Sequence, residues 1–121
     1  MPLSTKRKNV EGAIQRALVR WIHETYPHIK VVATLNENNR HCMDMGCDDG
    51  ITDLILFDRV DGVLHVFFHE LKKLKGTLQP NQVDWEIDYV MRYASSNTHY
   101  AVGYGFEQSK KNVIDWQVQI H

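Results

Sequence analysis

The segment ITDLILFDRVDGVLHVFFHELK, residues 51–72, contains two strongly apolar runs on either side of a short polar stretch. An Asp-Gly pair between two apolar runs is a strong signal for a tight β-hairpin, and Asp61-Gly62 stands in this position. If these two residues form the centre of the turn, counting outward along both strands places Asp53 directly opposite Glu70. A single β-bulge would shift this register by one residue, so the pairing is a hypothesis for the structure to test.

Charged residues end the apolar rows of both predicted strands. Side chains alternate along a strand, so Glu70 and Lys72 share a face with the apolar Val66 and Phe68, and Asp53 ends an apolar row in the same way. Burying unpaired charge is costly, and opposed like charges destabilise a strand pair. A divalent cation such as Mg²⁺, which proteins hold with one or two carboxylates and several waters, would supply the missing charge.

A further carboxylate comes from the start of the chain. Residues 9–26 show a helical pattern, and Glu11 lies on the edge of its apolar stripe, from which it can reach the same site if the helix packs on the sheet. Taken singly, these features have ordinary explanations. A lone Glu-x-Lys is usually a surface ion pair, and an acid in a first helical turn often answers the helix dipole. The combination of Glu11 with the three charged residues of the hairpin favours a metal site.

The remaining segments complete an α/β pattern. We expect a strand at residues 29–35, a polar loop at 36–50, a helix from Pro80 to about residue 94, and a strand at 98–106. The type of the last element, residues 113–120, is left open. In the helix beginning at Pro80, the residues expected to face inward are Val83, Ile87, Val90, Met91 and Ala94. The order α-β-β-β-α-β predicts a mixed central sheet flanked by helices.

Length and composition fit a single domain over residues 1–121, because 43% hydrophobic residues supply a core for one domain and the chain is too short for two. There is no apolar run long enough to span a membrane, and the basic N-terminus lacks the apolar stretch of a secretory signal. Two cysteines make no disulfide framework, so we expect a reducing, cytoplasmic setting. The net charge of −1 argues against a simple basic DNA-binding domain, although carboxylates that hold a cation present positive charge to a phosphate.

An ordered set of motifs resembles a known family. Gly50-Ile51-Thr52-Asp53, Glu70-Leu71-Lys72, Gly76-Thr77-Leu78 and Gln82 resemble the VRR-NUC (virus-type replication-repair nuclease) branch of the PD-(D/E)XK nucleases, with Glu11 as the family's early helical glutamate. The resemblance runs from Glu11 to about residue 94, and Asn36 and Arg40 resemble a polar pair that often precedes the aspartate strand. Thr52 departs from the pattern, because the family usually has proline there.

The resemblance implies a restriction-endonuclease-like α/β core and a Mg²⁺-dependent endodeoxyribonuclease in which Mn²⁺ can substitute. Asp53, Glu70 and the Leu71 backbone carbonyl would be metal ligands, and Glu11 would complete the metal shell, directly or through water. This fits the chemistry, since phosphodiester hydrolysis needs a water made nucleophilic at neutral pH and a counter-charge for the phosphate.

The same resemblance implies roles outside the metal ligands. Lys72 would orient or activate the attacking water and stabilise charge on the phosphate, and Gln82 would position the site from the following helix. Stand-alone family members from phages and bacteria resemble resolvases of four-way (Holliday) junctions in DNA repair that act as homodimers. The expected partners are therefore branched DNA and a second copy of the chain, in the cytoplasm of a bacterial or phage-infected cell.

Other features leave alternatives open. Trp85, Tyr89 and Arg92 share a helical face that can be a dimer surface or a partly exposed core edge. His41, Cys42 and Cys47 make a poor zinc pattern with missing ligands. Several basic residues can form a phosphate-binding rim or be ordinary solvated charges: Lys6, Arg7, Lys8, Arg16, Arg20, Lys73, Lys75, Lys110 and Lys111. The competing functions are a non-catalytic module that grips DNA junctions, and an interaction protein with ordinary surface charge pairs.

Overall fold

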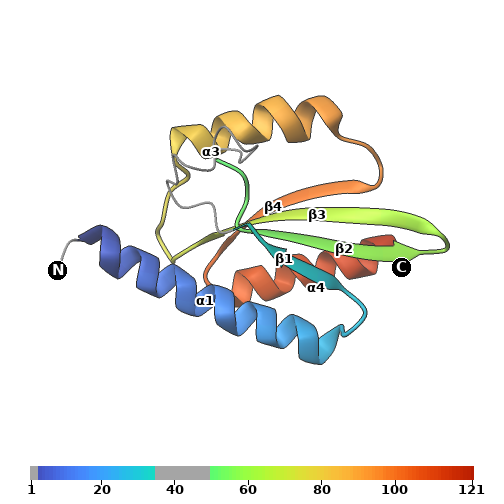
Figure 1. Cartoon of the computed structure of the whole chain (residues 1–121), viewed down its shortest axis with the longest axis horizontal. Helices are drawn as coiled ribbons and strands as arrows, with labels where there is room; N and C mark the ends of the chain where they lie inside the picture. Colours follow the sequence, from blue (N-terminus) through green and yellow to red (C-terminus); the bar gives the residue numbers. More distant parts are fainter. Residues whose placement is uncertain (1–2, 35–49) are drawn as a thin grey trace.

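A four-stranded mixed sheet lies between two layers of helices (Figure 1). The computed structural model describes residues 3–34 and 50–121, with side chains described from residue 10 onward. Within these residues the elements follow the order α1 (Leu3–Thr25), β1 (Lys30–Ala33), β2 (Leu54–Val60), β3 (Val63–Lys72), α3 (Pro80–Trp85), the π-helix η1 (Glu86–Met91), β4 (Thr98–Tyr104) and α4 (Phe106–Ile120). The predicted α-β-β-β-α-β order is therefore confirmed, and the terminal element whose type was left open is a helix.

The sheet has the strand order β1-β2-β3-β4, in which β1–β2 and β2–β3 pair antiparallel and β3–β4 pair parallel. Helices α1 and α4 cover one face, and α3 with η1 covers the other (Figure 1). The parallel β3–β4 pair requires a crossover connection, and α3 with η1 provides it.

The turn between β2 and β3 fixes the register of the whole hairpin. Asp61 has φ 50° and Gly62 has φ 79°, the left-handed pair that a two-residue hairpin turn of type I′ requires. Val60 pairs with Val63, and the pairing continues without a bulge to Leu54 opposite His69. The register predicted from Asp61-Gly62 is therefore confirmed, and the next position outward brings Asp53 beside Glu70.

The hydrophobic core lies between the sheet and the α1–α4 layer. Its buried members from α1, the chain before β1, the sheet and α4 are Leu18, Ile22, Ile29, Leu54, Leu56, Phe67, Leu71, Val113 and Trp116. Phe67 and Leu71 of β3 face this core. Because side chains alternate along a strand, Phe68, Glu70 and Lys72 lie on the opposite face of the sheet. The charged end of β3 thus faces the α3 side of the sheet.

The inward face predicted for the helix after Pro80 is wrong except for Val90. Val83, Ile87, Met91 and Ala94 are exposed, whereas Trp85 and Val90 are buried. The reason is the π-helix from Glu86 to Met91. Its i→i+5 bonding puts residues five apart on one face, so Trp85 and Val90 replace the three- and four-residue spacing of an ordinary helix.

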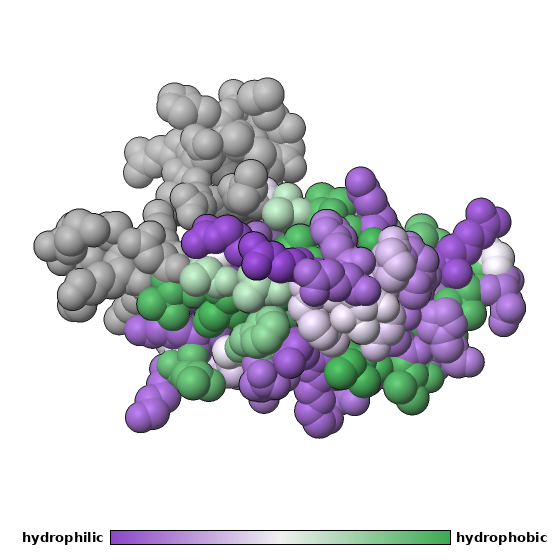
Figure 2. Space-filling model, turned by 90° about the horizontal axis from the view of Figure 1, so that it is seen from below, coloured by the Kyte–Doolittle hydropathy of each residue, from purple (hydrophilic) through white to green (hydrophobic). Residues whose placement is uncertain are grey.

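None of the helices in the described part of the chain is long and apolar enough to cross a membrane. Figure 2 views the molecule from the side of α1 and α4 and shows hydrophilic side chains interspersed with apolar ones over this face. Single exposed apolar side chains of this kind, such as Ile114 and Val118 on α4, are usual on protein surfaces.

Candidate active site

The chain that leads into β2 is held tightly and sets the position of Asp53. Gly50 has φ 86°, and a Cβ atom at this residue would overlap the backbone carbonyl of Asn81 at the start of α3, so only glycine allows this close approach. Thr52 is buried, its hydroxyl donates to the Leu54 carbonyl at 3.2 Å, and its own carbonyl accepts from the Thr34 hydroxyl at 2.7 Å. These hydrogen bonds fix the backbone where the family resemblance expects a proline.

Asp53 and Glu70 face each other at the open end of the hairpin. Asp53 Oδ2 accepts the Leu71 backbone N–H at 2.8 Å, which ties the carboxylate to the end of β3. Glu70 is only 1% exposed, and its Oε2 is buried with no hydrogen-bond partner. Burial, followed by the negative charge of Asp53, raises the pKa of Glu70 to about 10. Without added positive charge, therefore, the pair does not hold two ionised carboxylates at neutral pH.

Lys72 lies on the same face of β3 but compensates little of this charge. Its Nζ is 4.0 Å from Glu70 Oε1, and the side chain is buried. The lysine lowers the pKa of Glu70, but burial and the two neighbouring carboxylates of Asp53 and Glu11 outweigh it. The site therefore combines an under-compensated acidic pair with a buried ammonium group.

Glu11 and three lysines surround a cavity of about 140 Å³ beside this pair. The cavity is lined by Glu11, Lys72, Lys73, Lys75, Gly76, Thr77 and Gln79. The lysines after β3 reach it because the chain turns sharply there. The Gly76 N–H bonds the Lys73 carbonyl at 2.9 Å, and Lys75 has φ 64°. Glu11 comes from α1, and its charge also raises the pKa of Glu70. The hydrophilic cavity thus presents mainly positive groups at the edge of the acidic pair.

Gln82 links the site to the start of α3. Its Nε2 donates to Glu70 Oε1 at 2.9 Å, and its Oε1 accepts the Gln79 backbone N–H at 2.8 Å. One side chain thus satisfies an orphan N–H at the helix start and orients the Glu70 carboxylate. The structure brings all five sequence-predicted side chains, Glu11, Asp53, Glu70, Lys72 and Gln82, to one end of the sheet.

The donor set fits a hard divalent cation. Two facing carboxyl groups supply oxygen ligands, and Oε2 of Glu70 is a buried polar atom without a hydrogen-bond partner. A cation between the carboxylates would remove the repulsion that raises the Glu70 pKa. The Leu71 carbonyl belongs to the residue directly after Glu70 and offers a backbone oxygen at the same strand end.

Comparison with known proteins bears on the fold. No protein-family model matches the chain, and no curated protein sequence matches it. A solved structure described as "VRR_NUC domain protein" superposes with a TM-score of 0.65, covering 92% of this chain and 89% of that chain at 19% sequence identity. The chain has the fold of a VRR-NUC domain. The predicted nuclease-like α/β core is thereby confirmed at the level of the fold.

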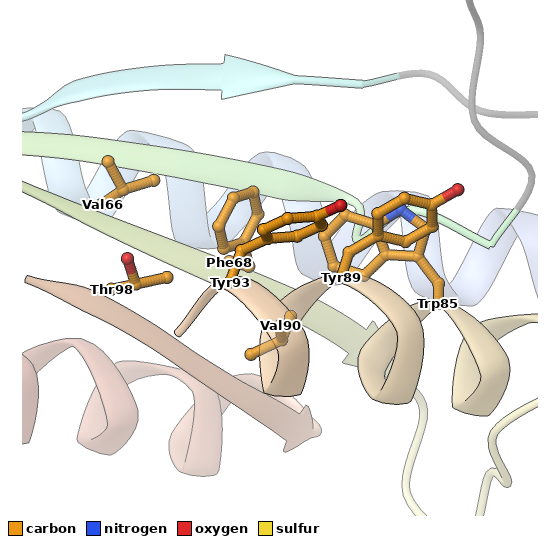
Figure 3. Close-up of a pocket in the computed structure, with 7 residues that line it drawn as sticks. All are labelled: Val66, Phe68, Trp85, Tyr89, Val90, Tyr93 and Thr98. Atoms are coloured by element: carbon orange, nitrogen blue, oxygen red, sulfur yellow. The ribbon is translucent and has the colours of Figure 1, made fainter. Parts of the chain in front are cut away.

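A second, larger cavity of about 250 Å³ opens further along the same face of this VRR-NUC fold (Figure 3). It lies between β3 and the α3–η1 helix and is lined by Val66, Phe68, Trp85, Tyr89, Val90, Tyr93 and Thr98. The centroid of the Trp85 ring is 5.2 Å from the centroid of the Phe68 ring and 5.7 Å from that of the Tyr89 ring. Its lining carries no carboxylate, histidine, lysine or cysteine, whereas the smaller cavity is lined by one glutamate and three lysines. Trp85 is buried and Tyr89 is exposed, so the aromatic face is partly core and partly surface.

Sequence reasoning missed Tyr100 on β4, which pairs with Phe68 in the sheet register. Burial, then the negative charges of Glu86 and Glu70, raise the pKa of Tyr100 well above its usual value. A neutral phenol therefore lies within the electrostatic reach of Glu70. The alternating pattern of this strand gives no signal of that, because the proximity of Tyr100 to Glu70 depends on the parallel pairing of β4 with β3.

The other residues singled out from the sequence lie elsewhere. His69 faces the core side, with Nε2 3.2 Å from Asn112 Nδ2, and burial lowers its pKa to about 4. Arg16 and Arg20 are exposed on α1, while Lys110 and Lys111 pair with Glu107 and Asp115 on α4. The following lie outside the residues whose side chains are described: Lys6, Arg7, Lys8, Asn36, Arg40, His41, Cys42 and Cys47.

Proposed function

We propose that this chain is a metal-dependent DNA endonuclease, with residues 1–121 acting as one nuclease domain. The observation that carries the proposal is the opposed pair of Asp53 and Glu70, with the unpartnered Glu70 Oε2 and the buried Lys72 beside it. The VRR-NUC fold supports it. The two acids are those that the sequence resemblance to that family implies as metal ligands.

The proposed cation is Mg²⁺, with Mn²⁺ as a substitute. Asp53 and Glu70 would hold it together with the Leu71 carbonyl, and Glu11 would hold a water of its shell. These are hard oxygen donors, as such ions prefer. When bound, the cation supplies an acidified water and a positive charge next to the scissile phosphate.

The chain's own residues account for the rest of the proposed chemistry. Lys72 Nζ would donate to a non-bridging phosphate oxygen or hold the attacking water, and its burial strengthens that interaction relative to bulk water. Gln82 keeps the Glu70 carboxylate in one orientation through its 2.9 Å hydrogen bond. Lys73 and Lys75 at the charged cavity would bind neighbouring phosphates without reading bases.

The proposed substrate is branched DNA, such as the four-way junctions of DNA repair, cut by a homodimer. Paired cuts across a junction need two active sites related by symmetry. A candidate contact surface is the row of exposed apolar residues along α3 and η1, namely Val83, Ile87 and Met91, of which Met91 is 68% exposed. The bacterial or phage-infected cytoplasm expected from the sequence stays a prediction.

A non-catalytic junction-binding module is the second candidate, and it predicts that a catalytic group has been lost. Asp53, Glu70, Lys72 and Gln82 are all present and lie together, which favours the enzyme.

The deciding experiment incubates the protein with Mn²⁺ and a labelled four-way junction, with a flap and a linear duplex in parallel. We expect cleavage of the junction, and its loss in Asp53→Asn. The matched control is Asp61→Asn, an exposed turn residue whose left-handed φ asparagine tolerates. Tight junction binding without cleavage would favour the binding module, and neither binding nor cleavage would overturn both proposals.

A further inference from the structure

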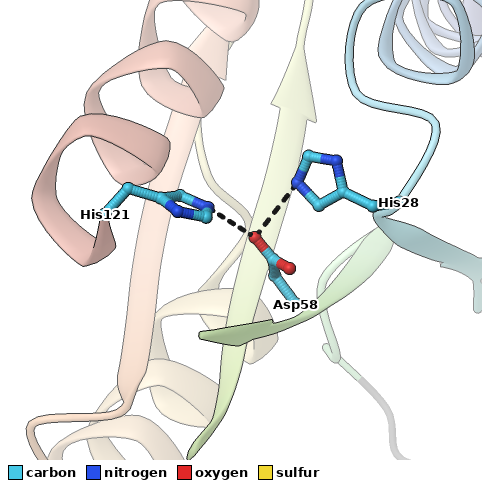
Figure 4. A group of neighbouring side chains, drawn as sticks. All are labelled: His28, Asp58 and His121. Atoms are coloured by element: carbon cyan, nitrogen blue, oxygen red, sulfur yellow. Dashed lines mark hydrogen bonds and ion pairs between the residues drawn. The ribbon is translucent and has the colours of Figure 1, made fainter. Parts of the chain in front are cut away.

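A second cluster of titratable side chains lies at the turn end of the hairpin, away from the acidic pair. It consists of His28, from the connection between α1 and β1, Asp58, from β2, and His121, which follows α4 (Figure 4). Asp58 belongs to the core-facing row of β2 with Leu54 and Leu56, whereas Asp53 lies on the other face. The cluster is therefore separate from the proposed nuclease site in both strand end and sheet face.

Both imidazoles direct the same nitrogen at one oxygen atom. His28 Nε2 is 3.3 Å and His121 Nε2 is 3.1 Å from Asp58 Oδ2, and the two rings stand at 90° with centroids 6.0 Å apart. Figure 4 shows the rings converging on the carboxylate from opposite sides. One nitrogen from each histidine and one Asp58 oxygen lie within 4.8 Å of one another.

The Asp58 carboxylate is buried but kept ionised. Its side chain is 3% exposed. Burial raises the pKa of Asp58, but the hydrogen bonds from Gln117, His121 and the Arg59 backbone N–H outweigh that effect and lower the pKa.

Several nitrogen atoms surround the Asp58 carboxylate. Oδ1 accepts the Arg59 N–H at 2.7 Å, while Oδ2 is approached by three nitrogens, those of His28, His121 and Gln117, the last at 2.9 Å. His28 Nε2 is also 3.2 Å from Gln117 Oε1. In a hydrogen-bonded arrangement both histidines carry a proton on Nε2. His121 then donates to Asp58 Oδ2, and His28 donates to the same oxygen or to Gln117 Oε1.

The spacing suits a metal ion instead. Zinc binds histidine nitrogen and carboxylate oxygen at roughly 2.0–2.2 Å, so neighbouring ligand atoms of a tetrahedral site lie about 3.3–3.5 Å apart. The 3.3 Å separation of His28 Nε2 and Asp58 Oδ2 falls in this range, and the 3.1 Å separation for His121 is slightly shorter. The side chains of both histidines are 48% exposed, so an ion and a water in a fourth position can enter from solvent.

We propose that His28, Asp58 and His121 form a binding site for a divalent transition-metal ion of the zinc type. The ligands are the two Nε2 atoms and Asp58 Oδ2, with each neutral imidazole keeping its proton on Nδ1. Nitrogen ligands favour zinc over Mg²⁺, the ion that suits the all-oxygen acidic pair. Gln117 orients the carboxylate through its 2.9 Å hydrogen bond, the usual task of a group behind a metal ligand.

The bound ion would fasten three segments far apart in the chain. It joins the connection before β1, the turn end of β2 and the residue that follows α4. An ion that binds only the folded arrangement of such ligands stabilises the fold. The inference does not depend on nuclease activity, because none of its ligands belongs to the acidic pair.

The test uses the metal-free full chain and Co²⁺ as a spectroscopic probe, followed by Zn²⁺ in thermal unfolding. We expect one equivalent of Co²⁺ to produce visible d–d absorption. We expect zinc at about 100 times its Kd to raise the Tm by about 5–10 °C. Both effects should be lost in His121→Ala and in His28→Gln, which change exposed side chains and should leave the fold intact.

Three control variants should keep both effects. His23→Ala removes an exposed histidine at the end of α1, Asp61→Asn a nearby exposed aspartate, and Asp53→Asn an acid of the proposed nuclease site. Absence of Co²⁺ absorption and of any zinc-induced Tm shift would overturn the proposal, leaving a hydrogen-bonded cluster. A Co²⁺ signal unchanged in His121→Ala and His28→Gln, or a thiolate charge-transfer band, would place the ion elsewhere and also overturn it.

Discussion

The two ends of the β2–β3 hairpin carry buried carboxyl groups whose pKa values are shifted in opposite directions. At the open end, burial and the neighbouring charge of Asp53 raise the pKa of Glu70 to about 10. At the turn end, burial raises the pKa of Asp58, but hydrogen bonds led by that from Gln117 lower it overall. Burial alone therefore does not decide the charge of an acid in this sheet. The neighbouring groups decide it: several hydrogen-bond donors surround Asp58, whereas Glu70 has one donor, Gln82, and faces the negative charge of Asp53.

The difference predicts how each end depends on cations. The acidic pair must gain positive charge from outside before both carboxylates ionise, so cation binding there is coupled to the loss of a proton. Asp58 is already ionised, so its carboxylate imposes no such requirement. The predictions below separate the two ends, beginning with the largest expected effect.

Replacing Glu70 by glutamine should nearly abolish DNA cleavage and leave the fold intact. Glutamine has the shape of the neutral acid and can still accept from Gln82, but it cannot supply an anionic ligand. We expect Glu70→Gln to slow junction cleavage by about three orders of magnitude. Urea unfolding in EDTA should give a free energy of unfolding equal to or above that of the wild type, because a buried acid has been made permanently neutral.

The matched control is Glu107→Gln, a glutamate on α4 whose side chain is 84% exposed. It should leave cleavage unchanged. Glu70→Gln should also keep Co²⁺ binding at the turn end. If cleavage stayed within about tenfold of the wild type, Glu70 would not be a metal ligand and the proposed active site would be wrong.

How much of this could be predicted from the sequence depends on how local each feature is. Asp61-Gly62 fixed the hairpin register because a two-residue turn leaves one pairing, and Asp53 and Glu70 follow by counting. The inward face after Pro80 could not be predicted, because it follows the π-helix that puts Trp85 and Val90 on one face, and the spacing of the apolar residues indicates an ordinary helix there.

The cluster of His28, Asp58 and His121 could not be predicted from the sequence for a related reason. Asp58 stands in the polar stretch between the two apolar runs, and His121 lies 63 residues further along the chain, so only the folded arrangement brings them together. The acidic pair, in contrast, is built from adjacent strands, with Glu11 and Gln82 added by helices. Contacts between distant segments depend on the tertiary fold, which periodicity and turn chemistry do not specify.

His69 on β3 shows how burial alone, without a charged partner, changes a pKa. It is fully buried, and burial lowers its pKa from 6.5 to about 4, so the folded protein resists its protonation while the unfolded chain does not. The stabilising effect is complete above pH 6.5 and is lost as the pH falls towards 4. This lowering of the His69 pKa corresponds to about 3 kcal/mol of unfolding free energy.

Urea unfolding at pH 7 and pH 4 should therefore show a smaller loss of stability in His69→Gln than in the wild type. His23→Gln, an exposed histidine variant, should keep the wild-type loss. Equal acid sensitivity of His69→Gln and the wild type would mean that His69 is protonated without cost in the folded state.

Lys72 should matter for the phosphate rather than for the cation. Methionine has a similar length and fits a buried position, but it carries no charge. We expect Lys72→Met to lower the single-turnover cleavage rate by about 100-fold, the effect of removing one electrostatic donor from an active site. The Mg²⁺ concentration for half-maximal activity should change little. Lys111→Met, a largely exposed lysine paired with Asp115 on α4, is the control. A variant that needed much more Mg²⁺ but kept its maximal rate would assign Lys72 to the metal site instead.

Gln82 should have the smallest effect, because it orients a ligand and is not one itself. Its two hydrogen bonds, to Glu70 and to the Gln79 N–H, give Gln82→Ala two expected consequences. Cleavage should slow by about tenfold, and the free energy of unfolding should fall by about 1 kcal/mol, the usual worth of a hydrogen bond. The control is Gln119→Ala, at an exposed glutamine on α4. If cleavage were slower only because part of the variant is unfolded, lowering the temperature would restore the wild-type rate. A positioning role predicts that the tenfold defect persists where both proteins are fully folded.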